Sequence, residues 1–232
     1  MQIVVLVGGR GTRLGSLTND IPKPMMMING IPFLEILIKY LKQQGFTKII
    51  LCIGYLSNKI ENYFLDGRKF GVEIKYSKEE TPLGTGGAVS NAISLLEDEF
   101  IIINGDTFLE LDYKKFIDFS HKQKKLCVVV GFSSNQDSDF INNLFINKES
   151  EVKTYSKNKS FSNLNYVDAG IYFFKKEFMK FLNGPYPISL ENDIFPKLIQ
   201  KKEMSGYVTD KKFYDIGTPE KINKFKKFFE NF

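Results

Sequence analysis

The start of the chain constrains the fold most strongly. An apolar run, Ile3–Val7, leads directly into a glycine-dense turn, Gly8–Leu14, with the sequence GGRGTRL. A buried strand that ends in such a turn allows backbone N–H groups to approach a polyphosphate. Arg13 in the turn and Lys23 in the later segment PKPM supply the fixed positive charge that this ligand needs. The opening of the chain therefore predicts a triphosphate site.

Other interpretations of this turn fit less well. A P-loop requires Gly-Lys followed by Ser or Thr, which the turn lacks. In the dinucleotide fingerprint the third glycine follows the second by three residues, whereas Gly11 and Gly15 are one residue further apart. The next apolar run, Ile49–Ile53, is followed by Gly54 and not by the acid of that fingerprint. A plain glycine turn between a strand and a helix stays open as the alternative.

Strand-like and helix-like runs alternate through the first half of the chain. Strands separated by helices of this length imply right-handed crossovers and a mainly parallel sheet. We therefore predict an α/β fold, doubly wound and Rossmann-like, with helices flanking the sheet and ligands bound beyond the carboxyl ends of the strands. The expected strands are Ile3–Val7, Ile49–Ile53, Glu73–Tyr76 and Phe100–Ile103, and the expected helices are Pro32–Gln44, Ser57–Leu65 and Gly87–Leu96.

The second half has a more mixed pattern. Two polar, irregular stretches, 135–147 and 156–165, suit loops or a smaller subdomain that covers a substrate. No linker or internal repeat divides the chain, so residues 1–232 are expected to form a single domain. The expected strands are Leu126–Phe132, Val152–Tyr155 and Gly170–Phe174, and the expected helices are Glu191–Gln200 and Glu220–Asn231.

A carboxylate follows one of the expected strands. Asp106 ends the turn Asn104–Asp106, directly after Phe100–Ile103, and so belongs to the same edge of the sheet as the first glycine turn. Mg²⁺ prefers oxygen ligands and usually takes one or two carboxylates together with substrate phosphates. Asp106 is therefore a predicted metal ligand, with an ordinary structural turn as the alternative.

The motif GGRGTRL, with PKPM downstream, resembles the signature of the sugar-phosphate nucleotidyltransferases, also called nucleotide-sugar pyrophosphorylases. The similarity extends along most of the chain. It implies that Arg13 steadies the triphosphate and that Lys23 contacts the reacting phosphates, which makes both candidate catalytic residues. It also implies that the turn wraps the nucleotide phosphates through Gly8, Gly9, Gly11 and Thr12. The left-handed β-helix domain of some relatives is not expected, because the chain ends soon after its last predicted helix.

Two later motifs extend the resemblance to the metal and the base. Residues 213–219, FYDIGTP, resemble a family motif whose aspartate, here Asp215, joins Asp106 at the metal. The same stretch also suits a helix start with Thr218 as N-cap and Pro219 at the first position, and both interpretations can hold together. Residues 82–88, PLGTGGA, look most like guanylyltransferases that act on mannose-type or heptose 1-phosphates. The resemblance implies that this second glycine loop surrounds the base and ribose through Pro82, Gly84, Thr85 and Gly86.

The sugar side matches the family less closely. The stretch VDAGIY carries Asp168 where relatives have asparagine, and a carboxylate lacks the donor capacity of an amide. The stretch SLEND resembles a family motif in which Glu191 binds sugar hydroxyls; a plain helix N-terminus is the alternative. Lys157 lacks the glutamate that precedes the corresponding lysine in relatives. The resemblance implies sugar-phosphate binding by Lys157, Gly170 and Glu191.

Composition excludes several other classes of protein. No apolar run approaches the ~20 residues that cross a bilayer, and no signal peptide precedes the first strand, so we expect a cytoplasmic protein. The net charge of +5 comes from lysines on predicted helix surfaces, without the interleaved aromatic residues of a nucleic-acid platform. Cys52 and Cys127 lie in apolar runs and are expected to be buried thiols. We therefore expect no nucleic-acid or membrane partner and leave a homo-oligomer open.

Together these features predict an enzyme that transfers a nucleotidyl group from an NTP to a sugar 1-phosphate, giving an NDP-sugar and pyrophosphate for surface polysaccharide synthesis. GTP, D-glycero-α-D-manno-heptose 1-phosphate and Mg²⁺ are the expected substrates and cofactor. Mannose 1-phosphate as acceptor, and cytidylyl or uridylyl transfer, are the alternatives within the family. A metal-dependent glycosyltransferase would release NDP instead of pyrophosphate. A non-catalytic nucleotide-sugar-sensing subunit would be expected to have lost Arg13, Lys23 or one of the two aspartates.

Overall fold

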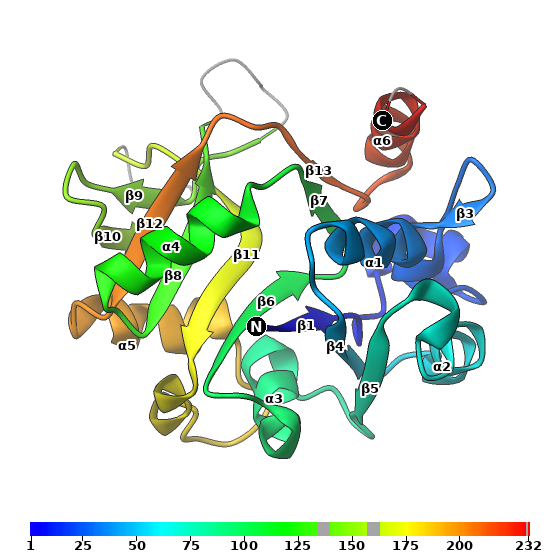
Figure 1. The fold of residues 1–232 in the computed structure, drawn as a ribbon, viewed down its shortest axis with the longest axis horizontal. Helices are drawn as coiled ribbons and strands as arrows, with labels where there is room; N and C mark the ends of the chain where they lie inside the picture. The colour runs from blue at the N-terminus through cyan, green and yellow to red at the C-terminus, as the bar shows by residue number, and fades with distance from the viewer. Residues whose placement is uncertain (134–139, 157–162, 231) are drawn as a thin grey trace.

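The computed structural model describes residues 1–133, 140–156, 163–230 and 232 (Figure 1). In the first half of the chain, strands alternate with helices along the sequence, as the pattern predicts. These elements are β1 (Gln2–Leu6), α1 (Phe33–Gln43), β4 (Lys48–Ile53), α2 (Ser57–Phe64), β5 (Glu73–Lys78), α3 (Gly84–Asn91) and β6 (Glu99–Asn104). The second half contributes α4 (Tyr113–Gln123), β8 (Cys127–Phe132), β11 (Val167–Lys175), α5 (Phe195–Gln200), β12 (Met204–Thr209) and α6 (Pro219–Phe229).

The central sheet contains seven of the described strands, in the order β12-β8-β11-β6-β1-β4-β5. Neighbouring strands are parallel except where β11 pairs with β6 and with β8. The prediction of a mainly parallel, doubly wound α/β fold is confirmed. No helix in the described part of the chain has the length and apolar character to cross a membrane.

The two faces of the sheet are covered by different helices. Along β1, Ile3 and Val5 belong to a hydrophobic cluster that includes residues of α1, α2, α4 and α6. Val4, between them, belongs to a second cluster with residues of α3 and α5. Successive side chains of a strand point to opposite faces, so this alternation places the two helical layers on opposite sides of the sheet. The near-continuous apolar composition of β1 follows from burial on both faces.

The two halves of the sheet meet at β1. β1 lies between β4 and β6, where the strand order reverses. Leu6 pairs with Asn104, and the N–H of Gly105 donates to the Leu6 carbonyl at 2.9 Å. In open α/β sheets ligands bind beyond the carboxyl ends of the strands at such a point. The first glycine turn and the turn with Asp106 therefore meet at this edge.

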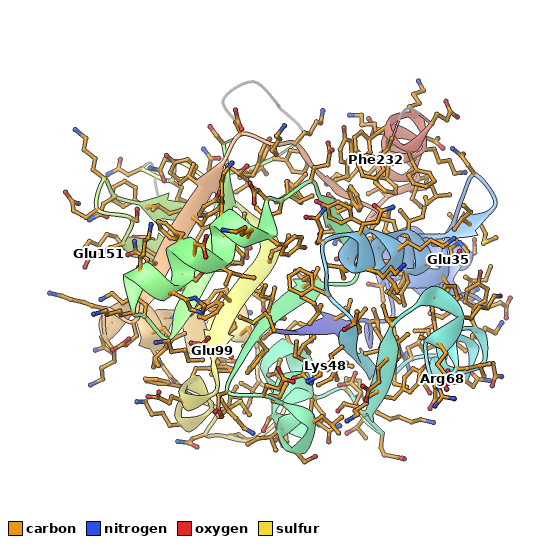
Figure 2. The ribbon with its side chains drawn as sticks, in the orientation of Figure 1. Glu35, Lys48, Arg68, Glu99, Glu151 and Phe232 are labelled. Carbon is orange, nitrogen blue, oxygen red and sulfur yellow. The ribbon has the colours of Figure 1, made fainter. Side chains whose placement is uncertain are left out.

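Among the described residues, three short strand pairs lie outside the central sheet: β2 (Met27–Ile28) with β3 (Ile31–Pro32), β9 (Leu144–Ile146) with β10 (Val152–Tyr155), and β7 (Thr107–Leu109) with β13 (Phe213–Asp215). Helix α6 holds the last pair through aromatic contacts. The ring centroid of Phe225 lies 5.4 Å from that of Phe108 on β7, and Phe228 stacks on Tyr214 of β13 at 4.4 Å. Phe232 lies beside α6 (Figure 2). Its ring centroid is 5.5 Å from that of Phe108. These rings fix β13, and with it Asp215, against the strand that follows Asp106.

Some expectations for the second half were wrong. The stretch 135–147 was expected to be irregular, but its end forms β9, which pairs with β10. The N–H of Ile146 on β9 donates to Oδ1 of Asn165 at 3.0 Å, and the side-chain amide of Asn165 donates to the Ile146 carbonyl at 2.9 Å. β12 and β13 were not predicted, because β12 contains polar residues and a glycine and β13 is only three residues long. The helix expected at Glu191–Gln200 begins with a wider turn, Leu190–Ile194, before α5. The expectation for the two cysteines is confirmed, since both are buried and free.

Candidate active site

A cleft of about 780 Å³ opens at the carboxyl ends of β1, β4, β5 and β6. This volume is typical of a pocket for a small molecule. Most of the residues predicted for the site line it: Gly8, Gly9, Gly11, Thr12, Arg13, Lys23, Pro82, Gly84, Thr85, Asp106 and Glu191. The fold thus brings both glycine loops, one aspartate and one sugar-side glutamate to a single cavity. The ligand atoms that each residue contacts stay a prediction.

The first glycine loop leaves open space at its centre. No described atom lies within 4 Å of the position that a Cβ on Gly9 would occupy. Gly11 has a left-handed backbone, with φ +66°, and a Cβ there would lie 2.9 Å from Cβ of Lys23. Glycine is needed at Gly11 because both the backbone angle and the close approach of the Lys23 segment exclude a side chain. The loop therefore packs on Lys23 at one position and stays open at another.

Lys23 and Asp106 form an ion pair at the floor of the cleft. Lys23 lies in a short 3₁₀ turn, Lys23–Met25, and its side chain is only 8% exposed. Its Nζ lies 2.5 Å from Oδ2 of Asp106, whose side chain is 32% exposed. A buried ammonium group requires a partner, because removing a charge from water is otherwise unfavourable. The pair holds the Lys23 ammonium group in one place at the edge of the sheet. A lysine on the surface would be free to move.

Asp215 lies on the strand next to Asp106. Asp215 pairs with Thr107, and the N–H of Ile216 donates to the Asp106 carbonyl at 3.0 Å. The Asp215 carboxylate accepts from the N–H of Gly217 at 2.8 Å and pairs with Nζ of Lys221 at 2.5 Å. Asp215 thus lies beside the cleft, outside the described residues that line it.

The two aspartates suit a hard cation. Their main chains are adjacent, each carboxylate is paired with a lysine, and carboxylate oxygens are the donors that Mg²⁺ takes alongside substrate phosphates. The guanidinium of Arg13 is also near, since a Cβ on Gly217 would lie 3.5 Å from its Cζ. Among the described residues no group of three or more acidic, histidine or cysteine side chains gathers as a ready-made metal cage. A shared Mg²⁺ site stays a prediction.

The second glycine loop packs against the protein itself. Gly84 has φ +78°, and a Cβ there would lie 2.4 Å from the carbonyl oxygen of Ile188. Gly86 donates its N–H to the same oxygen at 2.8 Å, and Ile188 donates back to Leu83 at 2.8 Å. Gly86, predicted to bind nucleotide, is buried and lies outside the described lining of the cleft. Close approach by the segment around Ile188 accounts for the glycines here, and Thr85 and Pro82 remain facing the cleft.

Glu191 is held from both sides of the cleft. Its Oε2 accepts from Oγ1 of Thr85 and from Oγ of Ser189, each at 2.7 Å. Thr85 Oγ1 in turn accepts from the N–H of Leu190 at 2.8 Å. The residue is 7% exposed and lines the cleft. Sugar binding by Glu191 stays a prediction.

Asp168 is directed into the protein. Its carboxylate accepts from Tyr172 Oη at 2.8 Å, from Tyr155 Oη at 3.2 Å and from the Gly170 N–H at 2.8 Å. Burial raises the pKa of Asp168 to about 6, partly offset by these donors. Gly170, with φ +70°, makes room for the amide of Asn104, which lines the cleft. Lys157 lies outside the described residues.

Glu79 is a cleft residue that the motif analysis did not single out. It follows β5, its Oε2 accepts from the N–H of Leu83 at 3.2 Å, and burial raises its pKa. Oε1 lies against two glycines, since a Cβ on Gly8 or on Gly54 would be 2.7 Å away. The signal that found Asp106, an acid just beyond the carboxyl end of a strand, would also have found Glu79.

Tyr55 is a second residue that the sequence did not reveal. It lies just beyond β4, and its N–H donates to the Gly8 carbonyl at 3.1 Å. Its hydroxyl donates to the Asn19 carbonyl at 2.9 Å, and the Arg10 guanidinium lies over its ring at 5.5 Å. Tyr55 therefore supports the start of the first glycine loop and the segment that follows the loop. No local motif indicates this role, because the contacts join distant parts of the chain.

Comparison with known proteins agrees with this geometry. Residues 2–231 match the model of one protein family, described as nucleotidyl transferase. The chain belongs to this family. This nucleotidyl transferase is 34% identical, over 95% of its length and 96% of the other protein, to a Campylobacter jejuni protein named D-glycero-alpha-D-manno-heptose 1-phosphate guanylyltransferase. A protein of the same name from Aneurinibacillus thermoaerophilus is 33% identical over 98% of this chain and 97% of its own.

A solved structure extends the similarity to three dimensions. The crystal structure of HddC from Yersinia pseudotuberculosis gives a TM-score of 0.84 at 34% identity, covering 98% of this chain and 99% of that one. The same protein complexed with GMP-PN gives a TM-score of 0.83 at 35% identity, with the same coverage. The predicted family, fold class and enzyme class are confirmed.

Proposed function

We propose that this nucleotidyl transferase transfers the guanylyl group of GTP to D-glycero-α-D-manno-heptose 1-phosphate and releases pyrophosphate. Support comes from the two full-length relatives that bear this name and from the GMP-PN complex of HddC. Mannose 1-phosphate is the second candidate acceptor. It is supported by a Mycobacterium tuberculosis mannose-1-phosphate guanylyltransferase that is 33% identical over 95% of this chain, which spans 62% of that protein.

The charges of the cleft suit this reaction. The sugar phosphate is already ionised at neutral pH, so an oxygen of its phosphate can attack the α-phosphorus of GTP without a strong general base. As that bond forms, the bond from the α-phosphorus to pyrophosphate breaks and negative charge moves to the leaving group. Lys23 and Arg13 would offset this charge, which makes catalysis a matter of positioning and electrostatics. Mg²⁺, when bound, would be held by Asp106 and Asp215 and would add positive charge at the phosphates.

The choice of base rests on the named relatives and the GMP-PN complex, and the chemistry of Glu79 suits it. Guanine has two adjacent donors on one edge, the ring N–H and the exocyclic amine, and a carboxylate accepts both. Adenine and the pyrimidines do not present that pair of donors. Glu79 lies in the cleft beside Gly8, the first residue of the phosphate loop, with Oε1 seated against two glycines. We propose that this carboxylate selects guanine.

A nucleotide panel tests the proposal. Release of pyrophosphate would be measured with GTP, ATP, CTP, UTP and dTTP against heptose 1-phosphate and mannose 1-phosphate. GTP should be preferred by at least ~10-fold in kcat/KM, which needs only about 1.4 kcal/mol of differential binding. Glu79→Gln should lower that preference, while Glu73→Gln, at the exposed start of β5 and outside the described lining of the cleft, should not. A preference for a pyrimidine nucleotide would exclude guanylyl transfer, and release of NDP would indicate a glycosyltransferase.

The setting of the reaction follows from its substrates. GTP and sugar phosphates are intracellular metabolites, so we propose that the enzyme acts in the cytoplasm. Its product, an activated heptose, would serve a glycosyltransferase that builds a surface polysaccharide. We also propose that residues 1–232 act as one domain, since both sides of the cleft are formed within the described chain.

A further inference from the structure

The hydroxyl of Thr85 connects two loops that the sequence assigns to different substrates. Thr85 belongs to the second glycine loop, which the family resemblance assigns to the base and ribose. Its Oγ1 nevertheless donates to Glu191 at 2.7 Å and accepts from the N–H of Leu190 at 2.8 Å. A threonine hydroxyl has a single proton to donate, and here that proton goes to Glu191. Both hydrogen bonds of Thr85 are therefore made to the sugar side.

These bonds fix the orientation of Glu191. Thr85, in the second glycine loop, and Ser189, two residues before Glu191, donate to the same oxygen, Oε2. A glutamate side chain that is free to rotate loses substantial conformational entropy when it binds a ligand. Two hydroxyl donors remove that freedom before the ligand arrives, which is the usual route to a preorganised polar contact.

The backbone around Thr85 makes the connection rigid. The N–H groups of Gly86 and Gly87 both donate to the Ile188 carbonyl, at 2.8 and 3.2 Å. Gly84 lies so close to that carbonyl that a side chain would collide with it. These contacts hold the second glycine loop against the segment around Ile188, which leads into Glu191. The Thr85 hydroxyl therefore keeps its position relative to Glu191.

We propose that Thr85 is a positioning residue for the sugar 1-phosphate, acting through Glu191. The inference rests on the proposed function, because it takes Glu191 as a ligand of the acceptor sugar. Thr85 then influences the acceptor from within the loop that faces the nucleotide.

The test compares Thr85→Val, which keeps the shape but removes the hydroxyl, with Thr85→Ser, which keeps the hydroxyl. In the pyrophosphate-release assay, using the better sugar 1-phosphate of the panel, Thr85→Val should raise KM for that substrate about tenfold and change KM for GTP by less than about twofold. Thr85→Ser should restore the wild-type KM. Combining Thr85→Val with Glu191→Gln should raise KM little beyond Glu191→Gln alone, because both changes disrupt the same contact between Thr85 and Glu191.

Tyr186→Phe is the matched control. It removes the hydrogen bond from Tyr186 Oη to Ser90 Oγ, at 3.2 Å, which joins the same two segments away from Glu191. Its KM values should equal those of the wild type. A rise in KM for GTP in Thr85→Val, additive effects with Glu191→Gln, or failure of Thr85→Ser to restore KM would overturn the role of Thr85 alone. A wild-type enzyme without turnover on any guanine nucleotide and sugar phosphate would refute the proposed function and this inference with it.

Discussion

The two sides of the cleft are built on different principles. On the nucleotide side, space and charge are left available: Gly9 has no described atom within 4 Å of its Cβ position, and Arg13 is exposed. On the opposite side, formed by the second glycine loop and the stretch around Asp168, the protein itself fills space that the sequence suggested for a ligand. Gly84 packs on Ile188, and Asp168 accepts three hydrogen bonds from within the protein.

The contrast between open and packed positions distinguishes residues that can contact a ligand from residues that support the shape of the site. A glycine with open space around it can admit a phosphate, whereas a glycine in contact with backbone serves the fold. A buried carboxylate whose oxygens are occupied by donors serves the fold in the same way. We therefore expect substitutions in the first glycine loop and its charged neighbours to affect catalysis first, and those at packed positions of the second glycine loop and the sugar side to affect stability first.

The largest effect is expected from Asp106→Asn. It removes a charge from the floor of the nucleotide side, and kcat should fall by ~10³-fold, about 4 kcal/mol of transition-state stabilisation. Stability should fall by only about 1 kcal/mol, because the amide oxygen still accepts from Lys23. Asp118→Asn, which breaks a surface pair with Lys114, is the control and should leave kcat unchanged. Normal turnover in Asp106→Asn would remove this residue from the site.

Gly84→Ala should show the opposite pattern, with a loss of about 3–4 kcal/mol in the free energy of unfolding. The added methyl group collides with the Ile188 carbonyl and also strains a left-handed backbone. Gly30→Ala separates the two causes. Gly30 has φ +84° but no described atom within 4 Å of its Cβ position, so its substitution should cost only about 1–2 kcal/mol. Equal losses, measured by urea unfolding, would mean that packing on Ile188 adds nothing.

The same contrast explains what the sequence could predict. The residues of the nucleotide side could be predicted from local features of the sequence: an apolar strand, a glycine turn directly after it, and an acid just after β6, the strand beside β1. These cues lie within short stretches, and the parallel sheet brings them together by a general rule. Lys23 was predicted from its neighbours, but its burial against Asp106, 83 residues later, was not.

The sugar side depends on contacts between distant residues. Asp168 replaces the asparagine of relatives, which put sugar contacts at this position in doubt. The sequence did not show that Tyr155 and Tyr172 would donate to its carboxylate inside the protein. Glycine enrichment in the second loop gave no sign that Ile188, more than a hundred residues away, fills the space. A short motif specifies residue type and spacing, but it does not specify which partner a side chain finds after the chain has packed.

Asp168 makes the sugar side sensitive to pH. Burial raises its pKa from 3.8 to about 6, so between these values the folded protein holds a proton that the unfolded chain has lost. This contribution to stability is fully present below about pH 4 and is lost as the pH rises through about 6, with a total of about 2–3 kcal/mol. Urea unfolding at several pH values should show this decline in the wild type and not in Asp168→Asn. Parallel curves would mean that Asp168 titrates normally in the folded protein.

The smallest effect, and the sharpest test of the comparison, is expected from Gly9→Ala. Gly9 has no positive φ and its Cβ position is open, so alanine should change the free energy of unfolding by no more than about 0.5–1 kcal/mol, in either direction. If nucleotide phosphates approach this backbone, the methyl group intrudes on them, and KM for GTP should rise about tenfold while KM for the sugar 1-phosphate stays near its wild-type value. Gly84→Ala adds the same methyl group at a packed position with a left-handed backbone, and Gly30→Ala accounts for the backbone part of that difference. Unchanged KM and unchanged stability in Gly9→Ala would show that the open loop does not receive the phosphates, and the division between the two sides of the cleft would fail.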